Sequence, residues 1–239
     1  PVFSFVAFLI IFAAFPGTAQ PSASLPLHDG FEFGAFAPWW TFVPAPSLPP
    51  AVSPTRVLES LSPAVGVGHA VLDNGTTGSH VLNELVLHLD LQDYEEVTLS
   101  FLARTFGGQP HILAPWAAFT GSPEWDGLAA SPDGVTWYPL RHLTTDHGLT
   151  TEYTEFTVNL DAAATAWGFS YTNTFLLRFS HYDNAPADGT LPPYAGLGLD
   201  EVRVTGRVRG DYDFGDAPAP YPSTLADDGA RHGRSAGPF

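Results

Sequence analysis

The stretch Leu197-Gly-Leu-Asp-Glu-Val-Arg-Val-Thr-Gly-Arg-Val208 decides the fold that we expect. Its apolar and polar residues alternate, so that Val202, Val204 and Val208 share one face. An alternation of period two is typical of a half-buried antiparallel strand. Asp200 has the same phase as the three valines, so the pattern predicts that its carboxylate points toward the core, where it needs a partner.

We expect that partner to come from the first strand of the same domain, at Asp29-Gly-Phe-Glu-Phe-Gly34. Other segments alternate in the same way, and turn-forming residues separate them. No segment shows a clear helical period. The sequence therefore predicts an all-β fold, a sandwich of two antiparallel sheets. The clearest of the other predicted strands are Leu85–Leu91, Val97–Ala103, Phe156–Leu160 and Phe175–Phe179.

The excess of acidic over basic residues limits the kinds of partner that the chain can bind. The 239 residues include nine basic residues, all of them arginine, against 25 acidic ones, which gives a net charge of −16. Such a surface neither neutralises phosphates nor is attracted to anionic lipids, so we expect no nucleic-acid partner and no binding to anionic membranes. It suits an extracellular surface or one that collects divalent cations. Cysteine is absent, which excludes a disulfide framework.

The beginning of the chain predicts export. The run Val2–Phe15 is apolar and is followed by Pro16-Gly-Thr-Ala-Gln20, which is typical of a secretory signal peptide that ends at Ala19. The run is short for a membrane span, which needs roughly 20 apolar residues. No Met or basic segment precedes it, so we interpret residues 1–19 as an N-terminally truncated leader. The chain is expected to be secreted or on the cell surface, without membrane insertion after leader cleavage.

The composition also divides the chain. Residues 20–26 are rich in proline and serine and are predicted to be a linker. Residues 27–206 hold the predicted strands. Residues 211–239 are acidic and rich in proline, and are predicted to form an irregular tail, since they cannot bury a core of their own. We interpret this tail as the incomplete start of a further module.

The pattern Asp29-Gly-Phe-Glu-x-Gly34, a following Trp39 or Trp40, and Leu199-Asp-Glu-Val-Arg-Val204 together resemble known secreted modules. These are the jelly-roll modules of bacterial proteins, of the carbohydrate-binding, galactose-binding-like and MAM/concanavalin-like kinds. The resemblance covers roughly residues 27–206 and implies a jelly-roll sandwich. In such modules the Glu of the first strand and the Asp of the last often help to bind a structural Ca²⁺, which points to Glu32 and Asp200.

Four carboxylates are the metal-ligand candidates. Calcium takes several converging oxygen ligands, and the first and last strands of a sandwich can lie side by side. The alternative is that Asp200 caps backbone amides and that Glu32 is solvated. The candidate ligands for Ca²⁺ are Asp29, Glu32, Asp200 and Glu201.

The tail resembles a second family. Asp213-Phe-Gly-Asp-Ala-Pro218, Tyr221-Pro222 and Leu225-Ala-Asp-Asp-Gly-Ala-Arg-His232 are similar to the start of a GEVED-type repeat of large bacterial surface proteins. The resemblance covers only residues 211–239, and the Gly-Glu-Val-Glu-Asp signature is absent. It implies a multidomain secreted or cell-surface parent and no catalysis.

Tryptophan is the candidate contact for sugar rings. Most tryptophans of a sandwich belong to the core, because each buries a large area. We expect Trp125 to be the exposed one, because its acidic and glycine neighbours indicate a loop. The candidate tryptophans for an aromatic platform are Trp39, Trp40, Trp116 and Trp125.

Two acidic groups are candidates for other roles. Glu124-Trp-Asp126 resembles the spaced carboxylates of concanavalin-like glycoside hydrolases, in which two carboxylates lie about 5 Å apart or farther for inversion. The third acid of that motif would fall at Ala129, which favours an ordinary turn. Asp183, Asn184 and Asp188 are likewise predicted to belong to a polar turn.

Residues 131–137 contain a turn motif. Ser131-x-Asp-Gly-x-Thr-Trp137 resembles an Asp-box turn with one residue deleted, which implies a structural hairpin whose Trp137 anchors it in the core.

The sequence favours a non-catalytic secreted or cell-surface module for binding or adhesion, with a glycan or extracellular-matrix ligand and a structural Ca²⁺. The alternatives are a glycoside hydrolase-like enzyme of concanavalin-like fold and a purely structural spacer.

Overall fold

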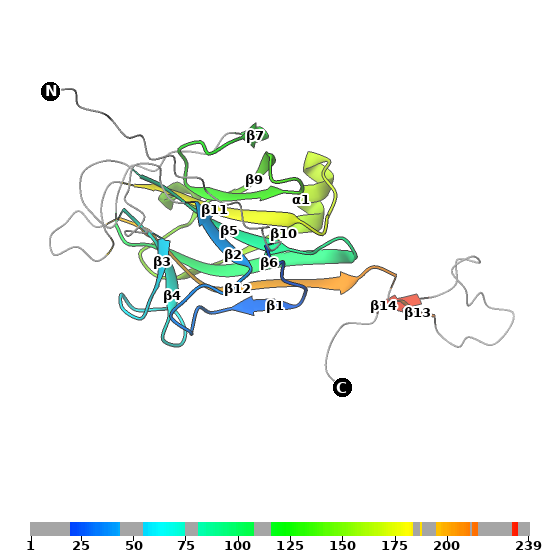
Figure 1. Ribbon diagram of the computed structural model, residues 1–239, viewed down its shortest axis with the longest axis horizontal. Coiled ribbons are helices and arrows are strands. Elements are labelled where there is room, and N and C mark those ends of the chain that lie inside the picture. The colour runs from blue at the N-terminus through cyan, green and yellow to red at the C-terminus, as the bar shows by residue number, and fades with distance from the viewer. Residues whose placement is uncertain are drawn as a thin grey trace, which may run out of the picture.

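Strand β12 (Leu197–Val208) lies inside the first of two sheets in the computed structural model (Figure 1). It pairs antiparallel with β6 (Tyr94–Thr105) along one side. Along the other side it pairs first with β4 (His69–Leu72) and then with β1 (Leu27–Asp29). Two strands complete this sheet at its edges, β10 (Thr154–Asn159) beside β6 and β3 (Thr55–Leu58) beside β4.

The structure describes residues 20–43, 55–74, 81–107, 116–183, 187, 195–210, 212–214 and 231–233. The predicted leader, residues 1–19, and most of the predicted tail lie outside these ranges. Within them, no helix is both long enough and apolar enough to cross a membrane.

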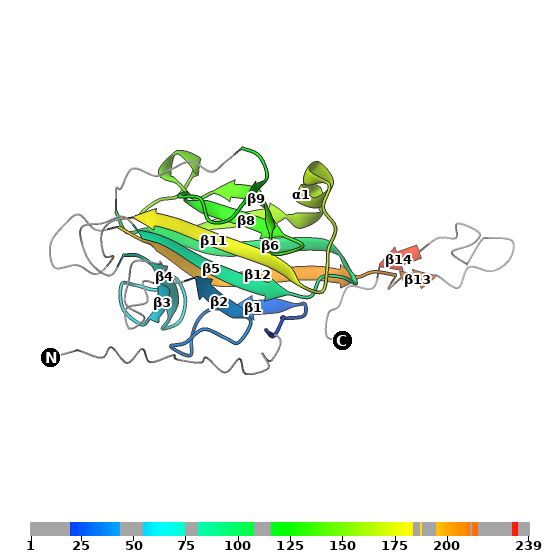
Figure 2. The ribbon, with the colours of Figure 1, turned by 45° about the horizontal axis from the view of Figure 1, so that its top comes forward.

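The second sheet has six antiparallel strands in the order β2-β5-β11-β8-β9-β7 and lies over the first (Figures 1 and 2). The predicted all-β jelly-roll sandwich is therefore confirmed. The central pair of this sheet, β5 and β11, is nine residues long in each strand. The strands are β2 (Trp40–Val43), β5 (Val81–Leu89), β7 (Phe119–Thr120), β8 (Gly127–Ser131), β9 (Thr136–His142) and β11 (Phe175–Asp183).

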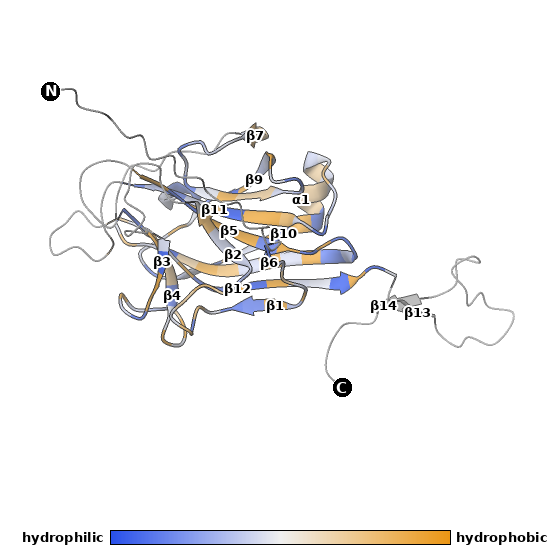
Figure 3. Ribbon diagram, viewed as in Figure 1, coloured by the Kyte–Doolittle hydropathy of each residue, from blue (hydrophilic) through white to orange (hydrophobic). Residues whose placement is uncertain are grey.

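The main core fills the space between the sheets. Leu85 and Leu87 of β5 face Leu99 and Phe101 of β6, and all four are buried. The ring of Phe101 meets that of Phe179 edge to face, at 5.1 Å between centroids. Burial of each such side chain is worth about 1.5–3 kcal/mol relative to exposure. The alternation is visible as orange and blue segments along the strands in Figure 3.

Asp200 does not point into this core, which corrects the predicted phase. The pairing of β12 with β6 shifts by one residue between Asp200 and Arg203, and Glu201 has a left-handed φ of 52°. This is a β-bulge, in which one strand holds an extra residue. Leu199 and Val202 on either side of it both belong to the core, so Asp200 lies on the outer face of the sheet.

The predicted inward orientation of Val208 is also wrong. Its side chain is 46% exposed. A second register shift separates Thr205 from Arg207, and Glu96 on the partner strand has a left-handed φ of 56°. A period-two pattern cannot be continued through such a shift.

One helix was missed. Leu160, which was predicted to end a strand, begins α1 (Leu160–Trp167). The Asn159 side chain accepts a hydrogen bond from the Ala162 amide at 2.8 Å, and Gly168 ends the helix with a φ of 74°. Both are standard cap signals, but two turns are too short to show a helical period.

Both ends of the predicted sandwich differ from expectation. Ala23, assigned to the linker, is buried and exchanges backbone hydrogen bonds with His88 and Asp90, so this segment packs on the second sheet. The tail predicted to be irregular contains a short antiparallel pair, β13 (Tyr212–Phe214) with β14 (Arg231–Gly233).

A buried polar cluster closes one end of the core. His181 lies between two carboxylates, with Nδ1 3.2 Å from Asp126 Oδ1 and Nε2 3.1 Å from Asp183 Oδ2. All three side chains are at most 1% exposed. Asp73, at the end of β4, forms an ion pair with Arg56 and accepts a hydrogen bond from the Ala187 amide at 2.7 Å.

This cluster corrects the prediction of a polar turn at Asp183. The residue ends β11, and it is fully buried. Asn184 and Asp188 lie outside the described residues.

A second buried histidine lies on the outer face of the first sheet. The Nδ1 atom of His69 is hydrogen-bonded to the Tyr153 hydroxyl. Burial, with a smaller contribution from Arg104, lowers the pKa of His69 from 6.5 to about 4. The folded protein therefore holds this imidazole neutral at neutral pH.

A loss of stability in acid follows from His69. Folding lowers the pKa of His69, so below about pH 6.5 the unfolded chain takes up a proton at this residue and the folded chain does not. The folded state therefore loses stability relative to the unfolded state as the pH falls from about 6.5 toward 4. We expect the free energy of unfolding in urea to fall over this range, and to fall less steeply in a His69→Gln variant. Equal slopes in the two proteins would contradict this assignment.

Candidate functional site

The site lies on the outer face of the second sheet. Along β5, Leu85 and Leu87 point into the core, so Glu84 and Val86 point outward. Arg178 of β11 is directly opposite Val86, and it also points outward. Alternation along two neighbouring strands thus brings a carboxylate and a guanidinium to one surface.

The hairpin between β8 and β9 forms one wall of the site. The Asp133 Oδ1 atom accepts hydrogen bonds from the amides of Val135 and Thr136, both at 2.8 Å, and these bonds lower the pKa of Asp133. Gly134 supplies the left-handed φ of 73° that the turn requires. The Asp-box-like motif is therefore a turn that positions Trp137 beside Arg178.

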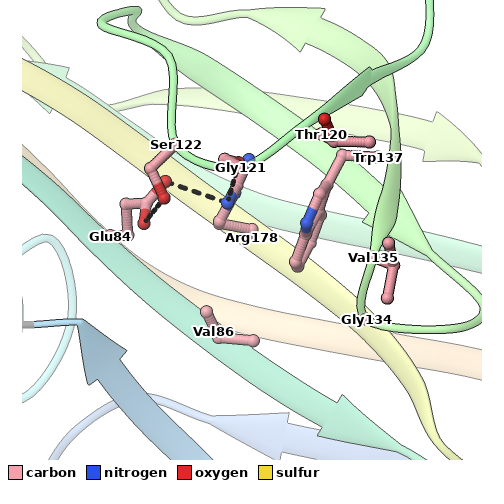
Figure 4. Close-up of a pocket in the computed structure, with 9 residues that line it drawn as sticks. All are labelled: Glu84, Val86, Thr120, Gly121, Ser122, Gly134, Val135, Trp137 and Arg178. Atoms are coloured by element: carbon pink, nitrogen blue, oxygen red, sulfur yellow. Dashed lines mark hydrogen bonds and ion pairs between the residues drawn. The ribbon is translucent and has the colours of Figure 1, made fainter.

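A pocket of about 370 Å³ opens between this hairpin, β7 and the central strands (Figure 4). This volume is within the range of small-molecule sites in proteins, roughly 300–1,000 Å³. Its principal lining residues are Glu84, Thr120, Ser122, Val135, Trp137 and Arg178.

An ion pair lies at the base of the pocket. Arg178 Nη1 is 3.0 Å from Glu84 Oε1, and the two side chains are only 4% and 2% exposed. The same nitrogen donates to the Gly121 carbonyl at 3.0 Å, and the Ser122 hydroxyl donates to Glu84 Oε2 at 2.7 Å. Burial raises the pKa of Glu84 and lowers that of Arg178, and each charge partly offsets the shift of the other.

Arg178 keeps unused donors. Its guanidinium carbon lies 3.9 Å from the centre of the Trp137 ring, a close cation–π contact. Its Nε and Nη2 atoms are buried, and neither has a hydrogen-bond partner in the described part of the chain. Buried donors are nearly always paired in folded proteins, so these two favour a ligand that brings acceptor oxygens.

The four predicted metal ligands have protein partners. Asp29 accepts hydrogen bonds from the Phe31 amide and the Trp40 indole, both at 2.9 Å. Glu201 is paired with His28 and Arg203.

Glu32 and Asp200 both hold the loop of residues 59–68. The Glu32 carboxylate accepts from the Val67 amide at 2.7 Å. The Asp200 carboxylate accepts from the amides of Ala64, Val65 and Glu201, at 2.9, 3.1 and 2.7 Å. Among the described residues, no group of three or more acidic or histidine side chains could hold a metal ion.

Trp125 is not exposed, and that prediction is wrong. Its side chain is fully buried in a small apolar cluster on the outer face, against Phe119 and Trp137. Gly127 makes this possible, because a Cβ there would lie 2.1 Å from the indole. A buried ring cannot stack on a sugar. The exposed tryptophan is Trp116, at 74%.

The two carboxylates of the candidate catalytic pair, Glu124 and Asp126, lie in different environments. Glu124 is exposed, whereas Asp126 is fully buried and accepts a hydrogen bond from the Tyr182 amide at 2.6 Å. A buried and paired carboxylate does not reach a substrate, so this geometry does not support the glycoside hydrolase alternative.

Sequence reasoning missed Glu84, Arg178 and Trp137 as site residues. A signal was present: Glu84 is followed by the apolar run Leu85-Val-Leu87, and Arg178 stands between Leu177 and Phe179. What the sequence did not show is that the two strands are neighbours.

No protein-family model and no curated protein matches the chain. Several solved structures resemble it distantly, and two of them are carbohydrate-binding modules. One is the carbohydrate-binding module TmCBM61 in complex with β-1,4-galactotriose, with a TM-score of 0.41 and 12% identity over 74% of this chain and 94% of that one. The other is the N-terminal CBM22-1–CBM22-2 tandem of Xyn10C from Paenibacillus barcinonensis, with a TM-score of 0.42 and 15% identity over 85% of this chain and 50% of that one. At these values the similarity carries no argument about the ligand of this chain.

Proposed function

We propose that the chain is a non-catalytic glycan-binding module that uses the pocket around Arg178. The observation that carries this proposal is a pair of buried Arg178 nitrogens beside the Trp137 ring that have no hydrogen-bond partner among the described residues. Sugar hydroxyls accept hydrogen bonds from such donors and donate to a carboxylate such as Glu84. The apolar faces of sugar rings pack on aromatic side chains.

The charge of the pocket favours a neutral glycan. The Glu84 carboxylate lies 3.0 Å from the Arg178 guanidinium and balances its charge. An anionic ligand would have to compete with this carboxylate within a chain of net charge −16. A neutral polyol needs no change in charge, and its hydroxyls satisfy donors and acceptors together.

The proposal includes the setting of the module. We place it in a secreted or cell-surface multidomain protein, where it contacts glycans or matrix and serves adhesion. Support comes from the leader-like residues 1–19 and from the resemblance of residues 211–239 to a GEVED-type repeat. A non-catalytic role is supported by the burial of Asp126.

Calcium binding stays a prediction. An ion held by Glu32 and Asp200 would replace the amides of the 59–68 loop, which now donate to these two carboxylates. Binding to the native state would raise the thermal midpoint by mass action. Comparing the midpoint in calcium with that in excess chelator tests this directly.

Two substitutions test the glycan site. Arg178→Lys keeps a cation beside Glu84 but removes the unused guanidinium donors. Thr120→Trp fills the pocket from an exposed position on β7. We expect affinity electrophoresis to show retention of the unmodified chain by at least one soluble neutral polysaccharide among galactan, xylan and glucomannan. Retention should weaken about tenfold or more in both variants.

The matched control is Thr205→Trp, the same change at an exposed strand position of the other sheet. It should leave retention unchanged. No retention of the unmodified chain by any of the three polymers would refute the proposal for neutral glycans. Equal retention of Thr120→Trp and Thr205→Trp would refute the choice of pocket.

A further inference from the structure

Two loops beside the first sheet present apolar side chains to solvent. Phe33, which follows β1, is 97% exposed, and Val65 and Val67 of the 59–68 loop are 49% and 56% exposed. The two loops lie against each other, because the Val67 amide donates to Glu32 Oε2 at 2.7 Å. The three side chains form an apolar patch, and exposed apolar side chains that gather in one place mark interaction surfaces.

The backbone beneath this apolar patch is held in uncommon conformations. Five non-glycine residues of the described chain have a left-handed φ, and four of them are here: Phe31, Leu61, Ser62 and Glu201, at 60°, 66°, 59° and 52°. Such conformations are unfavourable for residues that carry a side chain, and they gather at functional sites. Two amides of the loop donate to the Asp200 carboxylate, at 2.9 and 3.1 Å. The patch is therefore formed before any partner binds.

A pocket of about 290 Å³ opens beside Val65, on the outer face of the first sheet. Leu102 of β6 lines it, with Glu155 of β10 directly opposite on one side and the bulge at Glu201 of β12 on the other. This pocket and the one around Arg178 share no lining residue. Its principal lining residues are Val65, Ser100, Leu102, Glu155, Glu201 and Arg203.

The pocket carries a negative charge that the protein leaves uncompensated. Glu155 is exposed, and its carboxylate has no hydrogen-bond or ion-pair partner among the residues that the structure describes. Glu201 is only 7% exposed, and its Oε2 atom is shared by His28 Nε2, at 3.0 Å, and by Arg203. The Arg203 guanidinium is thus directed at Glu201. Of the two carboxylates that line the pocket, that of Glu155 is the one available to a ligand.

Size and charge together indicate the occupant. At about 290 Å³ the pocket lies just below the range of drug-sized sites, roughly 300–1,000 Å³, so it suits one long side chain. A lysine fits, because its methylene stem packs on apolar walls such as Val65 and Leu102 while its ammonium donates to a carboxylate. Lysine is favoured over arginine, because its compact ammonium needs no planar partner and leaves the pair of Arg203 and Glu201 in place. A second copy cannot supply it, since all nine basic residues of the chain are arginines.

We infer that this face is a docking surface for a lysine-bearing segment of another protein. The lysine enters the pocket and its ammonium binds Glu155, while apolar residues next to the lysine pack on the patch of Phe33, Val65 and Val67. The net charge of −16 attracts a basic segment before contact. The surface belongs to the other sheet from the Arg178 pocket, so neither proposal depends on the other.

NMR titration of the intact chain with short peptides tests this inference. The probe is acetyl-Leu-Lys-Leu-amide, and its matched control has norleucine in place of lysine and so lacks the ammonium. We expect the lysine peptide to move the backbone amide signals of Leu102 and Glu155 saturably, and the norleucine peptide to bind about tenfold more weakly or not at all. No saturable movement with the lysine peptide, or equally tight binding of the corresponding arginine peptide, overturns the inference.

Two pairs of variants locate the binding. Glu155→Gln should weaken binding of the lysine peptide about tenfold, whereas Glu152→Gln, which removes the same charge from an exposed residue outside the pocket, should leave it unchanged. Val67→Ser should weaken binding about threefold, and Val208→Ser, at an exposed position near the end of β12, should not. Binding that survives Glu155→Gln, or that Glu152→Gln weakens equally, would reflect attraction to the net charge alone and reject the pocket.

Discussion

Replacing His181 with glutamine should lower the free energy of unfolding by about 3–5 kcal/mol, the usual consequence of removing one member of a buried ion pair. His181 is fully buried, and it separates the carboxylates of Asp126 and Asp183. Burial alone would lower its pKa, but the two carboxylates outweigh burial and raise it to about 10. Loss of this imidazolium leaves two carboxylates in the interior without their shared cation.

The stabilisation that His181 provides should decrease as the pH rises. Because the pKa of His181 is raised from 6.5 to about 10 by folding, its stabilisation is fully present below pH 6.5 and is lost as the pH rises toward 10. Urea denaturation between pH 6 and pH 9.5 should therefore show declining stability. The decline should be absent in His181→Gln.

Two further variants make this result specific. His88→Gln changes a half-buried histidine of the same sheet, bonded to the Thr41 hydroxyl at 2.8 Å, and should cost less than about 1.5 kcal/mol. Asp183→Asn in the His181→Gln background should restore part of the lost stability, since it removes one uncompensated carboxylate. Similar losses for His181→Gln and His88→Gln would show that the buried cluster does not stabilise the fold.

Replacing Asp200 with alanine should cost about 3 kcal/mol, because three backbone amides lose a charged acceptor. Burial raises the pKa of this carboxyl, and the bonds from Val65, Glu201 and Ala64 oppose the shift. The loop of residues 59–68 should loosen in consequence, with faster amide exchange at Ala64 and Val65.

The same variant separates the two interpretations of Asp200. Chemical denaturation in excess chelator measures the loss due to the backbone bonds alone. A larger loss in calcium would support metal ligation, whereas equal losses in calcium and chelator would contradict it and leave Asp200 as the anchor of the loop. Asp90→Ala is the control, since Asp90 is exposed and should change stability by about 0.5 kcal/mol or less.

The sequence by itself determined the fold class and the location of most strands. Alternation of period two is a local property, and it identified β5, β6, β11 and β12 because a strand exposes successive residues to opposite faces. It could not locate the bulge at Glu201, because a register shift depends on pairing with a strand about 100 residues away. The orientation of Asp200 was predicted wrongly for that reason.

Only the tertiary structure decided which side chains meet. Trp125 has the neighbours of a loop residue, yet it is fully buried in a cluster with Phe119 and Trp137. Glu84 and Arg178 are 94 positions apart in the sequence and form an ion pair at 3.0 Å. Periodicity specifies the face of a strand on which a residue lies, but the pairing of strands specifies its neighbours, and pairing is set by packing of the whole chain.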